Sequence, residues 1–342
     1  MKAKSIIVSA TAVVLFIASL TSAEILYTIT DLGAGAAYDI NIHGQVVGLA
    51  PGGLGGHGAY MWENNTGRFL GFPGRSTAAH AINDYGQVVG RADFPWNNTS
   101  AEHAIFWENG VSTDYGQDLC SYNGINNLGQ AVGYGPGHSP AIWIDGVMTG
   151  LPAPGFGGAR DISDTGVVAG YAHGGCPGWT QITACIWDGG VRTCLGRLGS
   201  YISEAYAINN AGQVVGLSHI GDSFSPWHAF IWENGVMTDL GTLGVNYKSE
   251  ARGINNLGQV VGKSGKHAFL WENGVMIDLH TVCLGISDWD TTTASAINDN
   301  GVIVGYGSFK WKGHAFIMTP IPEPSTVLLI GLGGLILRKR RR

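Results

Sequence analysis

The chain has 342 residues, of which 54 are glycine and only 13% are charged. Its wealth of Gly, Asn, Val, Ile, Thr and Trp is typical of short strands joined by tight turns, and it argues against a helical protein. Seven of the nineteen Lys and Arg residues lie in the two terminal segments, so the part between them is acidic and we expect no nucleic-acid partner.

Residues 1–23 are predicted to be a secretory signal peptide. Lys2 and Lys4 precede an apolar stretch that ends at Leu20, and small residues follow as far as Ala23. A basic start, a short apolar core and a small-residue cleavage site are typical of exported proteins. The alternative is an uncleaved membrane anchor, for which the apolar run is short.

One ten-residue motif recurs seven times within residues 24–319. The copies are DINIHGQVVG (39–48), AINDYGQVVG (81–90), GINNLGQAVG (124–133), DISDTGVVAG (161–170), AINNAGQVVG (207–216), GINNLGQVVG (253–262) and AINDNGVIVG (296–305). Successive isoleucines of the motif are 37 to 46 residues apart. A period of about 43 residues suits the four-stranded blade of a β-propeller.

Each unit predicts four strands joined by two tight turns. In the fifth copy, Asn209 can bond the backbone two residues on, and Gly212 supplies a positive φ at little cost, so one strand ends at Ile208 and the next contains QVVG. The motif HAFIWENGVMTDLG (228–241) adds two strands around an Asn-Gly turn. Its third strand is apolar at consecutive positions, which indicates burial between blades. Six tryptophans share one position in this strand and are expected to pack there: Trp62, Trp107, Trp143, Trp187, Trp232 and Trp271.

The seventh unit is split between the two ends of the chain. It ends with HAFIMTP (314–320) and has no fourth strand, whereas YTITDLG (27–33) matches the fourth strand of other units and has no third strand before it. An open solenoid would explain the repeats but not this split. We therefore predict an all-β, seven-bladed β-propeller of four-stranded blades, closed by the N-terminal strand, which completes the last blade.

The triplets HAF at 228–230, 267–269 and 314–316, with HAI at 103–105, resemble the HAF family of extracellular repeats. The resemblance covers most of residues 25–319, although the third and fourth units depart from it with SPAIW and TACIW. It implies export and a β fold, and it implies no particular chemistry.

Four histidines recur at the start of the third strand: His103, His228, His267 and His314. A metal ion needs ligands within about 2.1 Å, and equivalent positions of neighbouring blades lie further apart than that away from the axis. We expect each histidine to be satisfied within its own surroundings. With no nucleophile elbow, phosphate loop or zinc spacing in the sequence, we predict no metal, no cofactor and no catalytic residue.

Two of the five cysteines are predicted to face each other across a hairpin. In CIWDGGVRTC (185–194) a turn at the two glycines places Cys185 opposite Cys194, which favours a cross-strand disulfide, with two free thiols as the alternative. Cys120, Cys176 and Cys283 have no partner that the sequence assigns.

Five tryptophans fall outside the third-strand position. All of them lie in the connections from the second to the third strand, or from the fourth strand to the next blade. These connections are long and variable, and they share one end of a blade. They are Trp96, Trp179, Trp227, Trp289 and Trp311. Exposed loop tryptophans are candidates for ligand binding, and the alternative is that each covers the edge of its own blade.

The last 23 residues, 320–342, resemble the PEP-CTERM sorting signal of Gram-negative bacteria. Pro322, Glu323 and Pro324 precede a short apolar stretch, and the basic run 338–342 follows it. The resemblance implies a short transmembrane segment, recognition by an exosortase-type membrane peptidase, and release to the cell surface or matrix. The alternative is a permanent C-terminal anchor, and we expect membrane contact through this segment only.

These features favour an exported, non-catalytic propeller that binds or organises a surface or matrix polymer, in particular polysaccharide. A first alternative is an extracellular glycan hydrolase or lyase that uses carboxylates in the axial funnel, for which Asp39, Asp161 and Glu204 lie near the innermost strand. A second alternative is a purely structural matrix protein with no discrete ligand.

Overall fold

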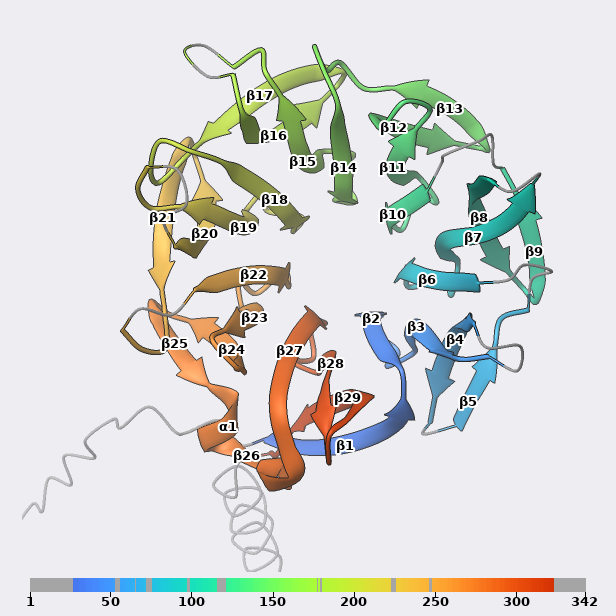
Figure 1. Ribbon diagram of the computed structural model, residues 1–342, viewed down its shortest axis with the longest axis vertical. Coiled ribbons are helices and arrows are strands. Elements are labelled where there is room, and N and C mark those ends of the chain that lie inside the picture. Colours follow the sequence, from blue (N-terminus) through green and yellow to red (C-terminus); the bar gives the residue numbers. More distant parts are fainter. Residues whose placement is uncertain are drawn as a thin grey trace, which may run out of the picture. The chain divides into compact units, whose positions relative to one another are not determined.

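The chain folds as a ring of seven β-sheets, which confirms the predicted propeller (Figure 1). The ring lies within the compact unit Leu26–Ile321. The computed structural model describes residues 27–52, 56–64, 66–71, 76–96, 99–115, 121–176, 178, 180–222, 226–245 and 248–322.

Blades 1 to 3 each have four antiparallel strands, and the first strand of each blade lies next to the axis (Figure 1). Blade 1 contains β2 (Ala36–Ile40), β3 (Val46–Pro51), β4 (His57–Glu63) and β5 (Thr66–Phe69). Blade 2 contains β6 (Ser76–Ile82), β7 (Val88–Trp96), β8 (Thr99–Glu108) and β9 (Val111–Asp114). Blade 3 contains β10 (Ser121–Ile125), β11 (Ala131–Gly135), β12 (Ser139–Ile144) and β13 (Val147–Gly150).

Blades 4 to 6 repeat this order. Blade 4 contains β14 (Gly157–Ile162), β15 (Val168–His173), β16 (Ile182–Asp188) and β17 (Val191–Gly196). Blade 5 contains β18 (Ser203–Ile208), β19 (Val214–His219), β20 (Trp227–Glu233) and β21 (Val236–Gly241). Blade 6 contains β22 (Ser249–Ile254), β23 (Val260–Ser264), β24 (His267–Glu272) and β25 (Val275–Asp278).

Both ends of the propeller meet in blade 7. Its strands are β27 (Trp289–Ile297), β28 (Ile303–Phe309), β29 (Lys312–Pro320) and β1 (Tyr27–Ala34). Strand β1 pairs antiparallel with β29, from Tyr27 opposite Pro320 to Ala34 opposite His314, which confirms closure by the N-terminal strand. Between β25 and β27 the chain forms α1 (Leu279–Val282), the short β26 (Cys283–Leu284), which pairs with β1, and the 3-10 helix η1 (Ile286–Asp288).

The recurrent histidine of the third strand bonds an aspartate of the fourth strand in its own blade. The Nδ1 to carboxylate distances are 2.9 Å for His103 and Asp114, 2.9 Å for His228 and Asp239, 2.8 Å for His267 and Asp278, and 2.8 Å for His314 and Asp31. In blade 7 this pair joins β29 to β1, so it forms part of the closure. These histidines therefore have a structural use.

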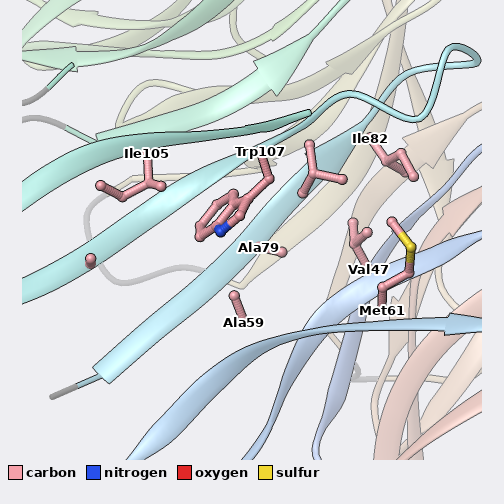
Figure 2. Packing of buried hydrophobic residues seen from close by; sticks show 9 residues of the cluster. Val47, Ala59, Met61, Ala79, Ile82, Ile105 and Trp107 are labelled. Carbon is pink, nitrogen blue, oxygen red and sulfur yellow. The ribbon is translucent and has the colours of Figure 1, made fainter. Parts of the chain in front are cut away.

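The core lies between the blades rather than within them. Between blades 1 and 2, Met61 and Val47 face Ala79, Ile105 and Trp107, all of them buried (Figure 2). The other five third-strand tryptophans also belong to clusters between blades, as predicted. Because these side chains pack against the neighbouring blade, they stabilise the ring only when that blade is present.

In six of the seven blades, one asparagine in the turn after the innermost strand links the blade to the next. In blade 5, Asn209 Oδ1 accepts hydrogen bonds from Ala211 N at 3.1 Å and Gln213 N at 3.0 Å, as the local turn chemistry predicts. Its Nδ2 donates to Gln213 Oε1 at 2.7 Å and to the carbonyl oxygen of Asn255, in blade 6, at 3.0 Å. All four hydrogen-bonding positions of the buried amide are thereby occupied.

The same amide bond runs around the axis and closes the ring. The six donor and acceptor pairs are Asn41 to Asn83, Asn83 to Asn126, Asn126 to Ser163, Asn209 to Asn255, Asn255 to Asn298, and Asn298 to Asn41. The last of these joins blade 7 to blade 1. Among the described hydrogen bonds, the link from blade 4 to blade 5 is missing because Ser163 replaces the asparagine.

Exchanging Ser163 and Asn298 tests this ring of amides. Ser163→Asn should raise the free energy of unfolding by about 1 kcal/mol, since it adds a bond to the carbonyl of Asn209. Asn298→Ser should lower it by about 0.5–1.5 kcal/mol, because the bond from Asn298 Nδ2 to the carbonyl of Asn41 is lost, while that carbonyl keeps its bond from Gly44 N. In most blades a glutamine lies four residues after the asparagine, but in blade 7 this position is Val302. Asn298 still bonds the carbonyl of Asn41, so the link between blades forms without that glutamine. Urea unfolding of both variants measures the effects, and equal losses in both would contradict the link.

Candidate functional site

Every innermost strand carries a β-bulge at the same position. In each case one residue of the first strand has no partner in its pairing with the second strand. In blade 1, Ala37 pairs with Gly48 and Asp39 with Val47, and Tyr38 between them is unpaired. The seven bulged residues are Tyr38, His80, Asn123, Arg160, Tyr206, Arg252 and Ser295. A bulge re-aims the side chain of its extra residue, and these seven together line one axial cavity of about 310 Å³.

The glycine that ends each QVVG motif explains why the bulge forms. A side chain at Gly48 would collide with the backbone carbonyl of Ala36 on the neighbouring innermost strand. The equivalent glycines meet the innermost strand in the same way: Gly90, Gly133, Gly170, Gly216, Gly262 and Gly305. Glycine is needed here for close approach of two backbones, and not for a turn.

Aromatic rings and a guanidinium gather on one side of the cavity. The Arg160 guanidinium lies 5.3 Å from the centre of the Tyr171 ring and 5.7 Å from those of Tyr134 and Tyr206. Its Nη2 lies 3.7 Å from Glu204 Oε2. Burial raises the pKa of Tyr206, so its hydroxyl remains a hydrogen-bond donor and acceptor.

The charges around the cavity balance in pairs. Arg252 makes two bonds to Glu250 Oε1, at 3.0 Å from Nε and 2.8 Å from Nη2. Arg91, which follows Gly90 in β7, pairs with Glu102. Together with Arg160 and Glu204, these pairs leave the cavity polar but without a strong field of either sign.

Neutral hydrogen-bonding groups complete the lining. Burial lowers the pKa of His80 to about 4, so the ring is neutral, and its Nδ1 lies 2.7 Å from the carbonyl oxygen of Tyr122. Nδ1 must then carry the proton, which makes Nε2 an acceptor. Tyr38 contacts the His80 ring edge-on, with 6.0 Å between the ring centres.

Two buried polar atoms of this lining have no hydrogen-bond partner among the described residues. They are Arg160 Nε in blade 4 and Ser295 Oγ in blade 7. A buried polar atom left without a partner costs stability, so such atoms are rare in folded proteins. Their presence at the cavity that the seven bulges form points to a bound molecule or water as their partner.

The carboxylates expected to serve an enzyme are used by the fold. Asp39 accepts the backbone N–H groups of Ile40 at 2.8 Å and of Ile82, in the next blade, at 2.9 Å. Asp161 accepts those of Ile162 at 2.8 Å and of Ile208 at 2.9 Å. The second bridge joins blades 4 and 5, where the amide of the turn asparagine is missing.

The sequence predicts exposed tryptophans in the connections, and three of the five have described side chains: Trp227, Trp289 and Trp311. Trp289 begins β27, is 5% exposed, and packs on Phe309 and Phe316, so its assignment as an exposed ligand contact is wrong. Of the three whose side chains the structure describes, only Trp311 is well exposed, at 85%. Trp227 is half-buried beneath the Lys248 amine, 3.7 Å from its ring centre. Trp96 ends β7 with its side chain outside the described residues, and Trp179 lies outside them altogether.

The predicted cysteine pairing is also wrong. The hairpin has the expected register, with Cys185 opposite Cys194, but the disulfide joins Cys194 to Cys176, with 6.0 Å between their Cα atoms. Cys176 lies in the connection before β16. This connection comes back to the hairpin of β16 and β17, where Cys176 meets Cys194. Cys185 is a buried free thiol inside the cluster between blades 3 and 4. Cys283 is free and buried, and Cys120 lies outside the described residues.

The bulged residues are the functional candidates that sequence reasoning missed. A signal was available, because the position two residues before the isoleucine of each motif differs in kind from blade to blade whereas its neighbours recur. Among the described residues, no group of three or more His, Cys, Asp and Glu side chains is placed to hold a metal ion.

The PEP-CTERM protein-sorting motif matches residues 320–342. Such a signal marks an exported, surface-associated protein of Gram-negative bacteria and implies processing by an exosortase. Glu323, Pro324 and the apolar stretch after them lie outside the described residues, and within those no helix has the length and apolar character to cross a membrane. The signal peptide and the HAF resemblance stay predictions.

Comparison with known proteins otherwise shows the fold alone. A search of curated proteins finds no match to this chain. The β-propeller domain of the Trilobed protease from Pyrococcus furiosus is similar, with 10% identity and a TM-score of 0.52 over 87% of this chain and 98% of that one. An acylaminoacyl peptidase from Pyrococcus horikoshii has 10% identity and a TM-score of 0.48, over 86% of this chain and 54% of that one. A gluconolactonase from Xanthomonas campestris has 11% identity and a TM-score of 0.43, over 87% and 92%.

Asp39 and Asp161 should make stability fall with rising pH. Burial raises the pKa of Asp39 to about 7 and that of Asp161 to about 6, against 3.8 in the unfolded chain. The folded state therefore binds more protons than the unfolded state between pH 4 and 7, and the free energy of unfolding declines across that window. The difference in unfolding free energy between the parent and the double variant Asp39→Ala, Asp161→Ala should shrink as pH rises from 4 to 7. A difference that grows instead would mean that the backbone bonds outweigh burial.

Truncation of Trp289 and of Trp311 should have very different effects on the free energy of unfolding. Trp289→Ala should lower the free energy of unfolding by about 3–5 kcal/mol, because it empties a buried site. Trp311→Ala should change it by less than about 0.5 kcal/mol, since the exposed ring loses little contact. Denaturant unfolding of the two variants checks the assignment, which fails if Trp311→Ala is the more damaging change.

Proposed function

We propose that this exported, surface-associated propeller is a non-catalytic binding protein whose axial funnel holds a sugar residue of surface or matrix polysaccharide. We use the name axial funnel for the cavity lined by the seven bulged residues. The observation that carries the proposal is their difference in kind: seven otherwise uniform blades place side chains of five different residue types around one cavity.

The lining suits a carbohydrate. Tyrosine rings offer apolar faces for a sugar ring, and their hydroxyls, with the Asn123 and Ser295 side chains, offer hydrogen bonds to sugar hydroxyls. The paired charges of Arg160 and Arg252 can bond hydroxyls without demanding a charged ligand. The cavity, at about 310 Å³, lies at the lower end of the range of ligand sites, about 300–1,000 Å³.

A binding role is favoured over hydrolysis by the state of the carboxylates. A glycosidase needs two carboxyl groups free to face the scissile bond. Asp39 and Asp161 each spend their oxygens on two backbone N–H groups, and Glu204 lies beside Arg160.

Two aromatic variants distinguish the funnel from the connections. Tyr38→Ala should weaken binding of surface polysaccharide, extracted from the cells that make the protein, by about threefold to tenfold, because one stacking contact is lost. Trp311→Ala is the matched control outside the funnel and should bind as the parent does. Isothermal titration measures both.

If Trp311→Ala weakens binding and Tyr38→Ala does not, the ligand binds to the connections between strands and not to the funnel. A parent protein that binds none of the extracted polysaccharide would contradict the proposal and favour a structural matrix protein.

A further inference from the structure

The axial funnel is walled on every side. Its seven lining residues come one from each blade, and the ring of blades is closed by the pairing of β1 with β29. A ligand cannot enter between the innermost strands, because the interfaces between blades are filled with buried apolar side chains. The cavity therefore differs from the open groove in which an enzyme or lectin holds the middle of a polymer.

The funnel continues along the axis beyond the seven bulged residues. Its deeper part, about 150 Å³, and the cavity beside the turn asparagines, about 210 Å³, share Ile254 and Ile297 in their linings. Isoleucines of the motif, such as Ile40 and Ile82, also belong to the apolar clusters between blades and so help to close the wall. Because the wall is closed, an internal segment of a polymer could reach these cavities only after a free chain end had been threaded along the axis.

We propose that the axial funnel recognises the end of a neutral glycan chain, one terminal sugar residue inserted along the axis, and not an internal segment. This inference rests on the proposed function and specifies its ligand. The closed wall excludes a chain that passes across the site, so a polymer must enter by one of its ends. The pairing of Arg160 with Glu204, and of Arg252 with Glu250, favours a neutral residue over a charged one.

The two unpartnered atoms provide fixed points for such a residue. Arg160 belongs to β14 and Ser295 to β27, which lie on opposite sides of the axis (Figure 1). Arg160 Nε can only donate, whereas Ser295 Oγ can donate or accept. A sugar ring carries hydroxyls around its whole edge, so it can offer an acceptor to Arg160 Nε and a donor or an acceptor to Ser295 Oγ.

Chain length tests end recognition. Surface polysaccharide from the producing cells is partly hydrolysed, its neutral fraction is separated into size classes, and each class is titrated into the mature protein. Recognition of one chain end predicts one protein bound per glycan chain, with the same affinity per chain, in every size class. A stoichiometry that rises with chain length would overturn end recognition while leaving the proposed function intact. Failure of every class to bind would overturn the proposed function itself.

Ser295→Ala tests the anchoring atoms. Because Ser295 Oγ has no partner among the described residues, its loss should leave the melting temperature unchanged or raise it, while affinity for the size classes falls by about threefold to tenfold. Ser249→Ala is the matched control, since Ser249 Oγ accepts from Ala229 N at 2.8 Å and donates to Gly241 O at 2.6 Å. That variant should melt at a lower temperature and keep the parent affinity. Unchanged affinity in Ser295→Ala would overturn the assignment of this atom to the ligand.

Discussion

A buried amide in the turn of six of the seven blades holds the ring together. The asparagine after the innermost strand makes three of its four hydrogen bonds within its own turn and the fourth to the backbone of the next blade, as Asn209 does with Asn255. The local bonds fix the turn, and the turn fixes where the amide points. The same residue therefore sets the shape of a blade and its angle to the next, which explains why the motif recurs in every unit.

Departures from the motif are compensated where they occur. Ser163 cannot reach across as the amide does, and at this same interface Asp161 bridges to Ile208. In blade 1, Ile42 offers no side-chain acceptor to blade 7, and Asn300 Nδ2 instead donates to its carbonyl oxygen at 3.1 Å. Asp39 makes the same kind of bridge to Ile82, where the asparagine bond is also present. A buried carboxylate in this setting joins two blades, so burial and a raised pKa do not by themselves indicate catalysis.

The sequence predicts whatever depends on neighbours along the chain. The hairpins, their glycines with positive φ, the four-strand unit and the closing strand all follow from patterns of a few residues, and so does the register that sets Cys185 opposite Cys194. The bridge to Cys176 depends on the path of a long connection. The bulges depend on backbones that approach only in the folded sheet, at glycines such as Gly48. The variable position two residues before each motif isoleucine is visible in the sequence, but only the folded sheets show that these seven side chains line one cavity.

The bulge also explains how one repeat can carry an asymmetric site. A bulged residue lies outside the strand ladder, so its side chain can change without disturbing the pairing of its neighbours. Seven identical blades would present seven identical side chains to the axis, which suits a symmetric ligand such as an ion or water. Here Arg160, with three tyrosine rings around it, lies across the axis from Ser295, and His80 and Asn123 line the same cavity from blades 2 and 3. The asymmetry is confined to the position that the fold leaves unconstrained, and a ligand without sevenfold symmetry, such as a sugar ring, gives that asymmetry a use.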